Sequence, residues 1–222
     1  MIKIEYTNVY GFEAAIRGMR NPMNSWDKSD TVFDGDKWSV GENDLALMRK
    51  LALSGDDHGK FARFINVTAD ITAPLYFYKE LDTYKVGTVA NSCSTMHKIM
   101  DKPFELSDFS WEKVPDFNND SYIEEQLNLF NDLRDTYLNF DEYYENGVLH
   151  KNLKSKKDVW YALIQLLPSS YNQRRTVQLN YQVLNRIYHA RKNHKLDEWH
   201  AFCDWIESLP YFKEIYLSGD NK

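Results

Sequence analysis

Two shortages limit what kind of protein this chain can be. Its 222 residues include only two cysteines, Cys93 and Cys203, which form neither a disulfide framework nor a zinc motif. Positive charge is not in excess, because the formal net charge is −6. Non-specific binding to nucleic acid or to an anionic membrane needs a cationic face, so neither is expected.

Long apolar runs are also missing. No apolar stretch approaches the roughly 20 residues of a membrane span, so no membrane partner is expected. The N-terminal MIKIEYTNVYGF does not contain the long apolar core of a signal peptide. The sequence therefore predicts a cytoplasmic protein.

Several catalytic and cofactor motifs are absent. There is no GxGxxG after a strand and no GxxxxGK followed by Ser or Thr, which excludes the dinucleotide-binding fingerprint and the P-loop. GxSxG and HExxH are missing as well. One polar cluster near the C-terminus contains two pairs of possible metal ligands, one spaced i,i+4 and the other i,i+3. Each pair could lie on one face of a helix, but the two pairs do not obviously share the same face. Capping and ordinary surface polarity explain this cluster better than metal binding: His194, Glu198, His200, Cys203 and Asp204.

What the chain does have is enough apolar and aromatic residues, 43% and 15%, for a sizeable core. At this length one domain over 1–222 is favoured over two small ones. Periodicity and turn residues predict an α/β (α+β) protein with a loop or insertion at 101–120. Strands are predicted at 1–9 and 60–70, and a polar loop at 20–41. Short helices are predicted at 10–19 and 92–100, and another helix begins at Thr72 with Pro74 in its first turn. Further helices are predicted at 42–55, 121–140, 157–167, 170–193 and 195–209.

The C-terminal half is rich in amides and guanidinium groups. Together these suit a ligand that has both a phosphate and base-like edges. A solvated helix with a polar face would account for the same composition. The residues are Arg174, Arg175, Gln178, Asn180, Gln182, Asn185, Arg186 and Arg191.

The stretch ITAPLYFYKELDTYKVGTVANSCSTMHKI, residues 71–99, predicts a helix, a break and a second helix. The break is dense in small polar residues, as is common where a chain receives a nucleotide, yet it holds no arginine for a phosphate. His58 precedes Thr83-Tyr84-Lys85 by 25 residues, with Ala73-Pro74 between them, and Thr88 and residues 91–97 follow.

A second set of residues lies further along the chain: Leu167-Pro168, then Asn180 twelve residues after the proline, then Arg191 eleven residues after the asparagine. Together with the residues of the earlier segment, this spacing resembles the motif spacing of the flavin-dependent thymidylate synthases, the ThyX family. The resemblance spans roughly residues 41–191. It implies a single ThyX-like domain, in which a small curled sheet packs with several long helices.

The resemblance also implies ligands and assembly. A family member would bind FAD, a folate carbon donor and a pyrimidine nucleotide such as dUMP, and would form a homotetramer with active sites between subunits. Arg191 would be catalytic and would polarise the pyrimidine. The other residues implied are His58, Lys85, Thr88, Asn91 and Asn180 for the cofactor, and Ser92, Ser94, Arg174 and again Arg191 for the substrate.

Departures from the family pattern leave two functions open. Thr83-Tyr84-Lys85 replaces an Arg-His-Arg, and Ser92 and Met96 replace a Glu and an Arg. Each lost charge-assisted bond is worth about 1.5–3 kcal/mol, so two losses weaken binding by about two to four decades. The chain is then either a divergent enzyme for reductive methylation, or a nucleotide- or partner-binding protein of the same fold.

Other residues could take over these tasks. Lys79, Lys85, Arg20 and Arg174 are candidate replacements for the missing cations. The loop Arg20–Trp26 could lie near the pocket and stack a base on its tryptophan, or it could be an ordinary surface loop.

Overall fold

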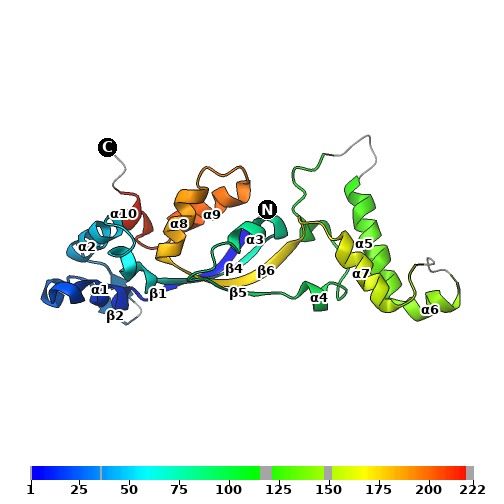
Figure 1. Ribbon diagram of the computed structural model, residues 1–222, viewed down its shortest axis with the longest axis horizontal. Coiled ribbons are helices and arrows are strands. Elements are labelled where there is room, and N and C mark those ends of the chain that lie inside the picture. Colours follow the sequence, from blue (N-terminus) through cyan, green and yellow to red (C-terminus); the bar gives the residue numbers. More distant parts are fainter. Residues whose placement is uncertain (1, 36, 116–121, 148–151, 219–222) are drawn as a thin grey trace. The chain divides into compact units, whose positions relative to one another are not determined.

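The structure is a computed structural model that describes residues 2–35, 37–115, 122–147 and 152–218 (Figure 1). In these ranges a four-stranded sheet has the order β1-β4-β6-β5, and a separate pair is formed by β2 and β3. The pair is antiparallel, with Phe33 opposite Trp38. The strands are β1 (Lys3–Tyr10), β2 (Val32–Asp34), β3 (Lys37–Ser39), β4 (Asn66–Pro74), β5 (Val89–Ser92) and β6 (Asn172–Asn180).

Helices make up most of the remaining described chain. The α-helices are α1 (Phe12–Arg20), α2 (Glu42–Leu53), α3 (Leu75–Leu81), α4 (Thr95–Lys98), α5 (Tyr122–Leu138), α6 (Phe140–Glu145), α7 (Lys156–Leu166), α8 (Tyr181–Arg191), α9 (Asp197–Glu207) and α10 (Phe212–Tyr216). Short 3-10 helices are η1 (Asn21–Met23), η2 (Trp26–Lys28), η3 (Gly59–Arg63) and η4 (Leu106–Asp108). In the part of the chain that is described, no helix combines the length and the apolar character needed to cross a membrane.

The chain divides into two compact units, and the division falls within β4, α3, β5 and β6. The first unit contains Thr72–Tyr78 and Ser92–Arg174. The second contains Ile2–Ile71, Lys79–Asn91 and the chain from Arg175 onward.

The core of the first unit lies where α5 packs along α7, as Figure 1 shows. Phe109 stacks on Trp111 with ring centres 4.2 Å apart and contacts Phe130, which is 1% exposed. Phe104 and Phe109 both come from the segment predicted as a loop or insertion at 101–120. The described part of that segment, residues 101–115, therefore contributes apolar side chains to the core, while residues 116–120 lie outside the described residues.

The second unit has a helical core around α8. This helix packs on α9 and η3, and α10 packs on α2. Tyr181, which is fully buried, touches the rings of Phe12 and Phe212 in edge-to-face geometry and donates its hydroxyl to Pro210 O at 2.6 Å. Burial of this kind satisfies the polar end of tyrosine while it removes the ring from water.

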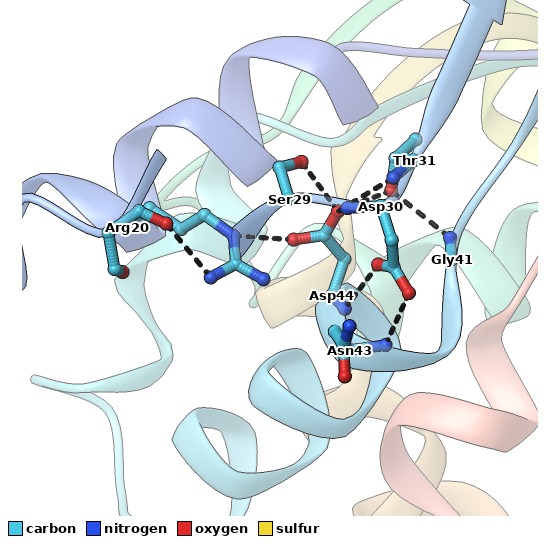
Figure 2. Close-up of polar contacts among 8 residues, drawn as sticks. Arg20, Ser29, Asp30, Thr31, Gly41, Asn43 and Asp44 are labelled. Carbon is cyan, nitrogen blue, oxygen red and sulfur yellow. Dashed lines mark hydrogen bonds and ion pairs between the residues drawn. The ribbon is translucent and has the colours of Figure 1, made fainter. Parts of the chain in front are cut away.

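A buried carboxylate joins α1, α2 and the segment between them. Asp44 accepts from Arg20 Nε at 2.6 Å, from Ser29 Oγ at 2.7 Å and from the hydroxyl and backbone N–H of Thr31 (Figure 2). Asp30 accepts from the first backbone N–H groups of α2 and so caps that helix.

This network corrects two sequence predictions. Arg20, 4% exposed, is paired with Asp44 and is not available to replace a missing cation. The stretch 20–41, predicted as a polar loop, holds η1, η2 and the β2–β3 pair. Trp26 is 51% exposed, and its Nε1 donates to Asn21 Oδ1 at 2.9 Å.

Most predicted elements are present, but besides the loop at 20–41 three predictions were wrong in whole or in part. The strand predicted at 60–70 begins as η3 and becomes β4 only at Asn66. The helix predicted at 170–193 is strand β6 followed by helix α8, because Val177 and Leu179 alternate with more exposed residues as in a strand. Thr72 does not start a helix: β4 continues to Pro74 and α3 begins at Leu75. Buried side chains alternate along β4 at Val67, Ala69, Ile71 and Ala73.

Candidate functional site

Arg191, the predicted catalytic residue, is the last residue of α8 and is held by three side chains. Its Nε donates to the Tyr84 hydroxyl at 3.0 Å, and its Nη1 donates to Glu80 Oε2 at 2.5 Å. Its guanidinium carbon lies 4.9 Å from the centre of the Trp199 ring. The side chain remains 20% exposed. The guanidinium is therefore fixed in place while part of it still meets solvent.

The two helices that carry this group are anchored in the core. On α8, Leu184 and Ile187 are fully buried, which fixes the rotation of the helix. On α9, Trp199 is fully buried and meets Phe202 edge-to-face at 5.6 Å. The ring on which Arg191 lies is therefore part of the core.

His194 also faces Glu80. Its Nε2 lies 3.3 Å from Glu80 Oε2, and its Nδ1 accepts the backbone N–H of Leu196 at 3.2 Å. Because Nδ1 is an acceptor, the proton of the neutral imidazole lies on Nε2 and points to the carboxylate. Glu80 therefore receives donors from both Arg191 and His194. We call Glu80, Tyr84, Arg191, His194 and Trp199 the Arg191 cluster.

The turn that follows α3 approaches the start of α8. Thr88 Oγ1 donates to Tyr84 O at 2.6 Å within this turn. A Cβ on Gly87, whose φ is +78°, would lie 2.7 Å from Asn180 Nδ2, so only glycine allows this approach. The amide oxygen of Asn180 accepts from Val183 N at 3.0 Å and caps α8. The structure thus brings the turn that contains Thr88 against Asn180, and both are predicted cofactor residues.

The other predicted cofactor residues of the second unit lie at exposed positions. Lys85 is in the same turn, and Asn91 is on β5. His58 immediately precedes η3, and its backbone N–H donates to Gly55 O at 3.1 Å. None of the contacts described for these three involves the Arg191 cluster.

A polar network connects the N-terminal half of α8 to Asp56, which lies two residues before His58. Arg186 pairs with Asp56, and Gln182 Nε2 donates to the same carboxylate at 3.2 Å. Gln182 Oε1 accepts from Arg63 Nε at 2.5 Å. The hydrogen bond from Arg186 lowers the pKa of Asp56, so the carboxylate stays charged at neutral pH. The network joins α8 to the turn before η3.

Three predicted substrate residues belong to the first unit. Ser94 caps α4 by accepting from His97 N at 3.4 Å, and Ser92 is exposed at the end of β5. Arg174, predicted on a helix, lies on β6, where its backbone oxygen accepts from Cys93 N at 2.9 Å. Ser92, Ser94 and Arg174 therefore lie near the point where β5 pairs with β6.

Sequence reasoning did not assign Glu80, His194 or Trp199 to this site. Glu80 had a weak signal, because it is an acidic residue at the end of the apolar α3, next to the Thr83-Tyr84-Lys85 segment. His194 belongs to the polar cluster that the sequence explains by capping and surface polarity rather than by metal binding. Within the described residues, no three His, Cys, Asp or Glu side chains are grouped so that they could hold a metal ion.

No known family model matches this chain by sequence, and no curated protein does. Solved structures do match. Thymidylate synthase X from Helicobacter pylori with FAD and dUMP matches at a TM-score of 0.64 and 14% identity, over 98% of both chains. A second Helicobacter pylori ThyX structure, also complexed with FAD and dUMP, gives a TM-score of 0.65 and 14% identity, over 97% of this chain and 98% of that one.

This chain has the fold of the flavin-dependent thymidylate synthases. The UMP/dUMP methylase PolB from Streptomyces cacaoi, bound with 5-Br dUMP, has the same fold at a TM-score of 0.57 and 14% identity, over 97% of this chain and 91% of that one. The predicted fold class and the predicted resemblance to ThyX are confirmed.

Within this ThyX fold, the turn after α3 does not fit a flavin diphosphate. Residues 80–85 carry two carboxylates, Glu80 and Asp82, and a single ammonium group on Lys85. Thr83 Oγ1 donates to Glu80 O at 2.7 Å, and Asp82 is bound by Arg175 at 2.8 Å. Because Glu80 and Asp82 already pair with Arg191 and Arg175, a diphosphate would find one exposed cation within residues 80–85, Lys85.

Proposed function

We propose that this protein binds a pyrimidine nucleotide of the dUMP type, with its base at the Arg191 cluster. The observation that carries the proposal is the fixed guanidinium of Arg191. It lies against the Trp199 ring and donates to the Tyr84 hydroxyl and to the Glu80 carboxylate. Solved proteins of the same fold, at 14% identity, hold dUMP or 5-Br dUMP, which supports the choice of nucleotide.

The chemistry of the cluster suits uracil. The uracil ring presents carbonyl oxygens on both sides of one N–H donor. A guanidinium donates to such oxygens, and a carboxylate accepts from such an N–H. Arg191 would donate to a carbonyl, and Glu80 would accept from N3–H. Cytosine has an acceptor at N3, which Glu80 would repel, so the site should prefer dUMP to dCMP.

A flavin-dependent methylation of this nucleotide is the second candidate function. It is supported by the FAD in both Helicobacter pylori structures. Such an enzyme would need FAD and a folate carbon donor. The charges of the turn after α3 favour the binding function over this enzymatic one. An absorption spectrum of the purified protein, before and after addition of FAD, separates the two.

Calorimetric titration with dUMP tests nucleotide binding. Arg191→Gln should weaken binding at least tenfold, about 1.4 kcal/mol, because the charged donor is lost. Arg191→Lys keeps the charge but loses the fork of donors, and should also bind more weakly. Arg17→Gln is the matched control, because Arg17 forms an exposed pair with Glu13 and lies outside the cluster.

A melting curve of each variant keeps the result interpretable. Binding is compared only at temperatures where every variant is folded. If Arg191→Gln binds dUMP as tightly as wild type while Arg17→Gln does too, the base does not lie at the Arg191 cluster.

A further inference from the structure

A cleft of about 510 Å³ opens in the first unit and is lined by residues of α4, the turn after it, α5 and α7. Its volume falls in the range of about 300–1,000 Å³ that is usual for small-molecule sites. It shares no residue with the Arg191 cluster, so what it binds does not depend on the proposed function.

Two aromatic side chains form rigid walls of this cleft. Trp160, on α7, donates its Nε1 to Met96 O at 3.2 Å, which fixes the plane of the indole. Trp160 and Tyr137 both pack against the core of the first unit. Met96 and Met100 add thioether groups to the lining. Flat rings and polarizable sulfur atoms favour a planar aromatic ligand.

The positive charge of the cleft comes from Arg134 on α5. Its Nε donates to Met100 O at 3.0 Å and its Nη2 to Asp101 O at 3.4 Å. Both partners are neutral carbonyls that follow the end of α4, so they orient the guanidinium without cancelling its charge. Among the described residues, no carboxylate forms an ion pair with Arg134.

Two neighbouring lysines, Lys98 and Lys156, add positive charge near the cleft, although neither is part of its lining. The Asp101 carboxylate lines it but is paired with Lys98 at 2.7 Å. The ammonium group of Lys156 lies 4.6 Å from the centre of the Tyr137 ring. His97 adds a further ring to the lining. Unpaired cations beside aromatic faces attract an anion rather than a cation.

We propose that this cleft binds a planar aromatic anion, with the ring beside Trp160 and Tyr137 and the anionic group on Arg134. The walls are held by the core and by backbone hydrogen bonds, so binding requires little ordering of the site. The ligand class is defined by its flat ring and its single carboxylate or phosphate.

Paired probes test the proposal by calorimetry on the full chain. The first probe is 2-naphthoate, and the second is its neutral analogue 2-naphthalenemethanol. Wild type should bind the anion at least tenfold more tightly. Arg134→Gln should reduce the affinity for 2-naphthoate at least tenfold and leave that for the alcohol within twofold. Lys157→Gln removes an exposed cation of α7 outside the lining and should change neither affinity by more than twofold.

A second pair of variants tests the cleft without removing a structural hydrogen bond. Met96→Trp places a large ring into the cleft, and Leu166→Trp makes a comparable change outside it, since both side chains are 52% exposed. Met96→Trp should weaken the binding of both probes at least tenfold, and Leu166→Trp should not. The proposal is overturned if wild type does not prefer the anion, or if Met96→Trp binds it like wild type.

Discussion

Asp44→Asn should destabilise the protein more than any exposed charge substitution. The carboxylate accepts five hydrogen bonds, from Arg20 Nε, Ser29 Oγ, Thr31 Oγ1 and the backbone N–H groups of Asp30 and Thr31. An amide can accept through only one of its two terminal atoms. The Arg20 side chain, 5% exposed, would then keep a buried charge with no anion beside it. Breaking such a pair costs about 3–5 kcal/mol.

Thermal unfolding measures this cost. At the ~2–4 °C per kcal/mol that is usual for chains of this length, the melting temperature should fall by about 6–20 °C. Asp82→Asn is the matched control, because Asp82 is paired with Arg175 but is 54% exposed. Exposed pairs contribute up to about 1 kcal/mol. Equal shifts in the two variants would refute the view that the buried network stabilises the fold.

The pH dependence gives a second test of the same network. Burial alone would raise the pKa of Asp44, but hydrogen bonds from Thr31, Ser29 and Arg20, together with the Arg20 charge, lower it below 3.8. A lowered pKa contributes stability that is present above the unfolded value and is lost as pH falls through the folded value. The difference in unfolding free energy between wild type and Asp44→Asn should therefore be constant above about pH 5 and shrink at lower pH. A constant difference down to the acid transition would contradict this assignment.

Three further predictions concern ligands and assembly. Glu80→Gln should reduce the preference for dUMP over dCMP, measured by calorimetry, because the acceptor for N3–H loses its charge; an unchanged preference would remove Glu80 from base recognition. If a flavin site persists, Thr83→Arg together with Ser92→Glu should bind FAD more tightly than wild type in calorimetry. The single variant Thr83→Arg is the control, because it shows whether the new cation only pairs with Asp82. If the folded double variant binds FAD no more tightly, the flavin function is rejected. The resemblance to ThyX predicts a homotetramer, so light scattering should give four times the 26.3 kDa chain mass, and a monomer would remove the basis for active sites shared between subunits.

Local patterns were sufficient to predict several of the helices but not all of them. The helix predicted at 121–140 is observed as α5, and the helix predicted at 157–167 is α7, whereas α6 was not predicted. Strand β6 was not predicted, because only Val177 and Leu179 show the alternation of a strand. The polar residues around them are equally compatible with the polar face of a helix. A strand is stabilised by its neighbours in the sheet, and these are distant in sequence.

The candidate site was predicted only in part for the same reason. Arg191 was identified by its spacing, but its partners Glu80 and Tyr84 are 111 and 107 residues away along the chain. Arg20 was proposed as a free cation, because nothing in its local sequence indicates the buried pair with Asp44, 24 residues on. Pairings of this kind depend on packing between helices, which local periodicity does not encode.

The Nε–H resonance of Arg191 tests the central proposal most directly. In protein labelled with ¹⁵N-arginine, this signal is assigned by its loss in Arg191→Lys, and it is followed as dUMP is added. If dUMP binds at the Arg191 cluster, the Arg191 signal should shift and saturate, while the signal of Arg20, held in the buried pair with Asp44, should stay in place. Binding of dUMP that leaves the Arg191 signal unchanged would contradict this proposal.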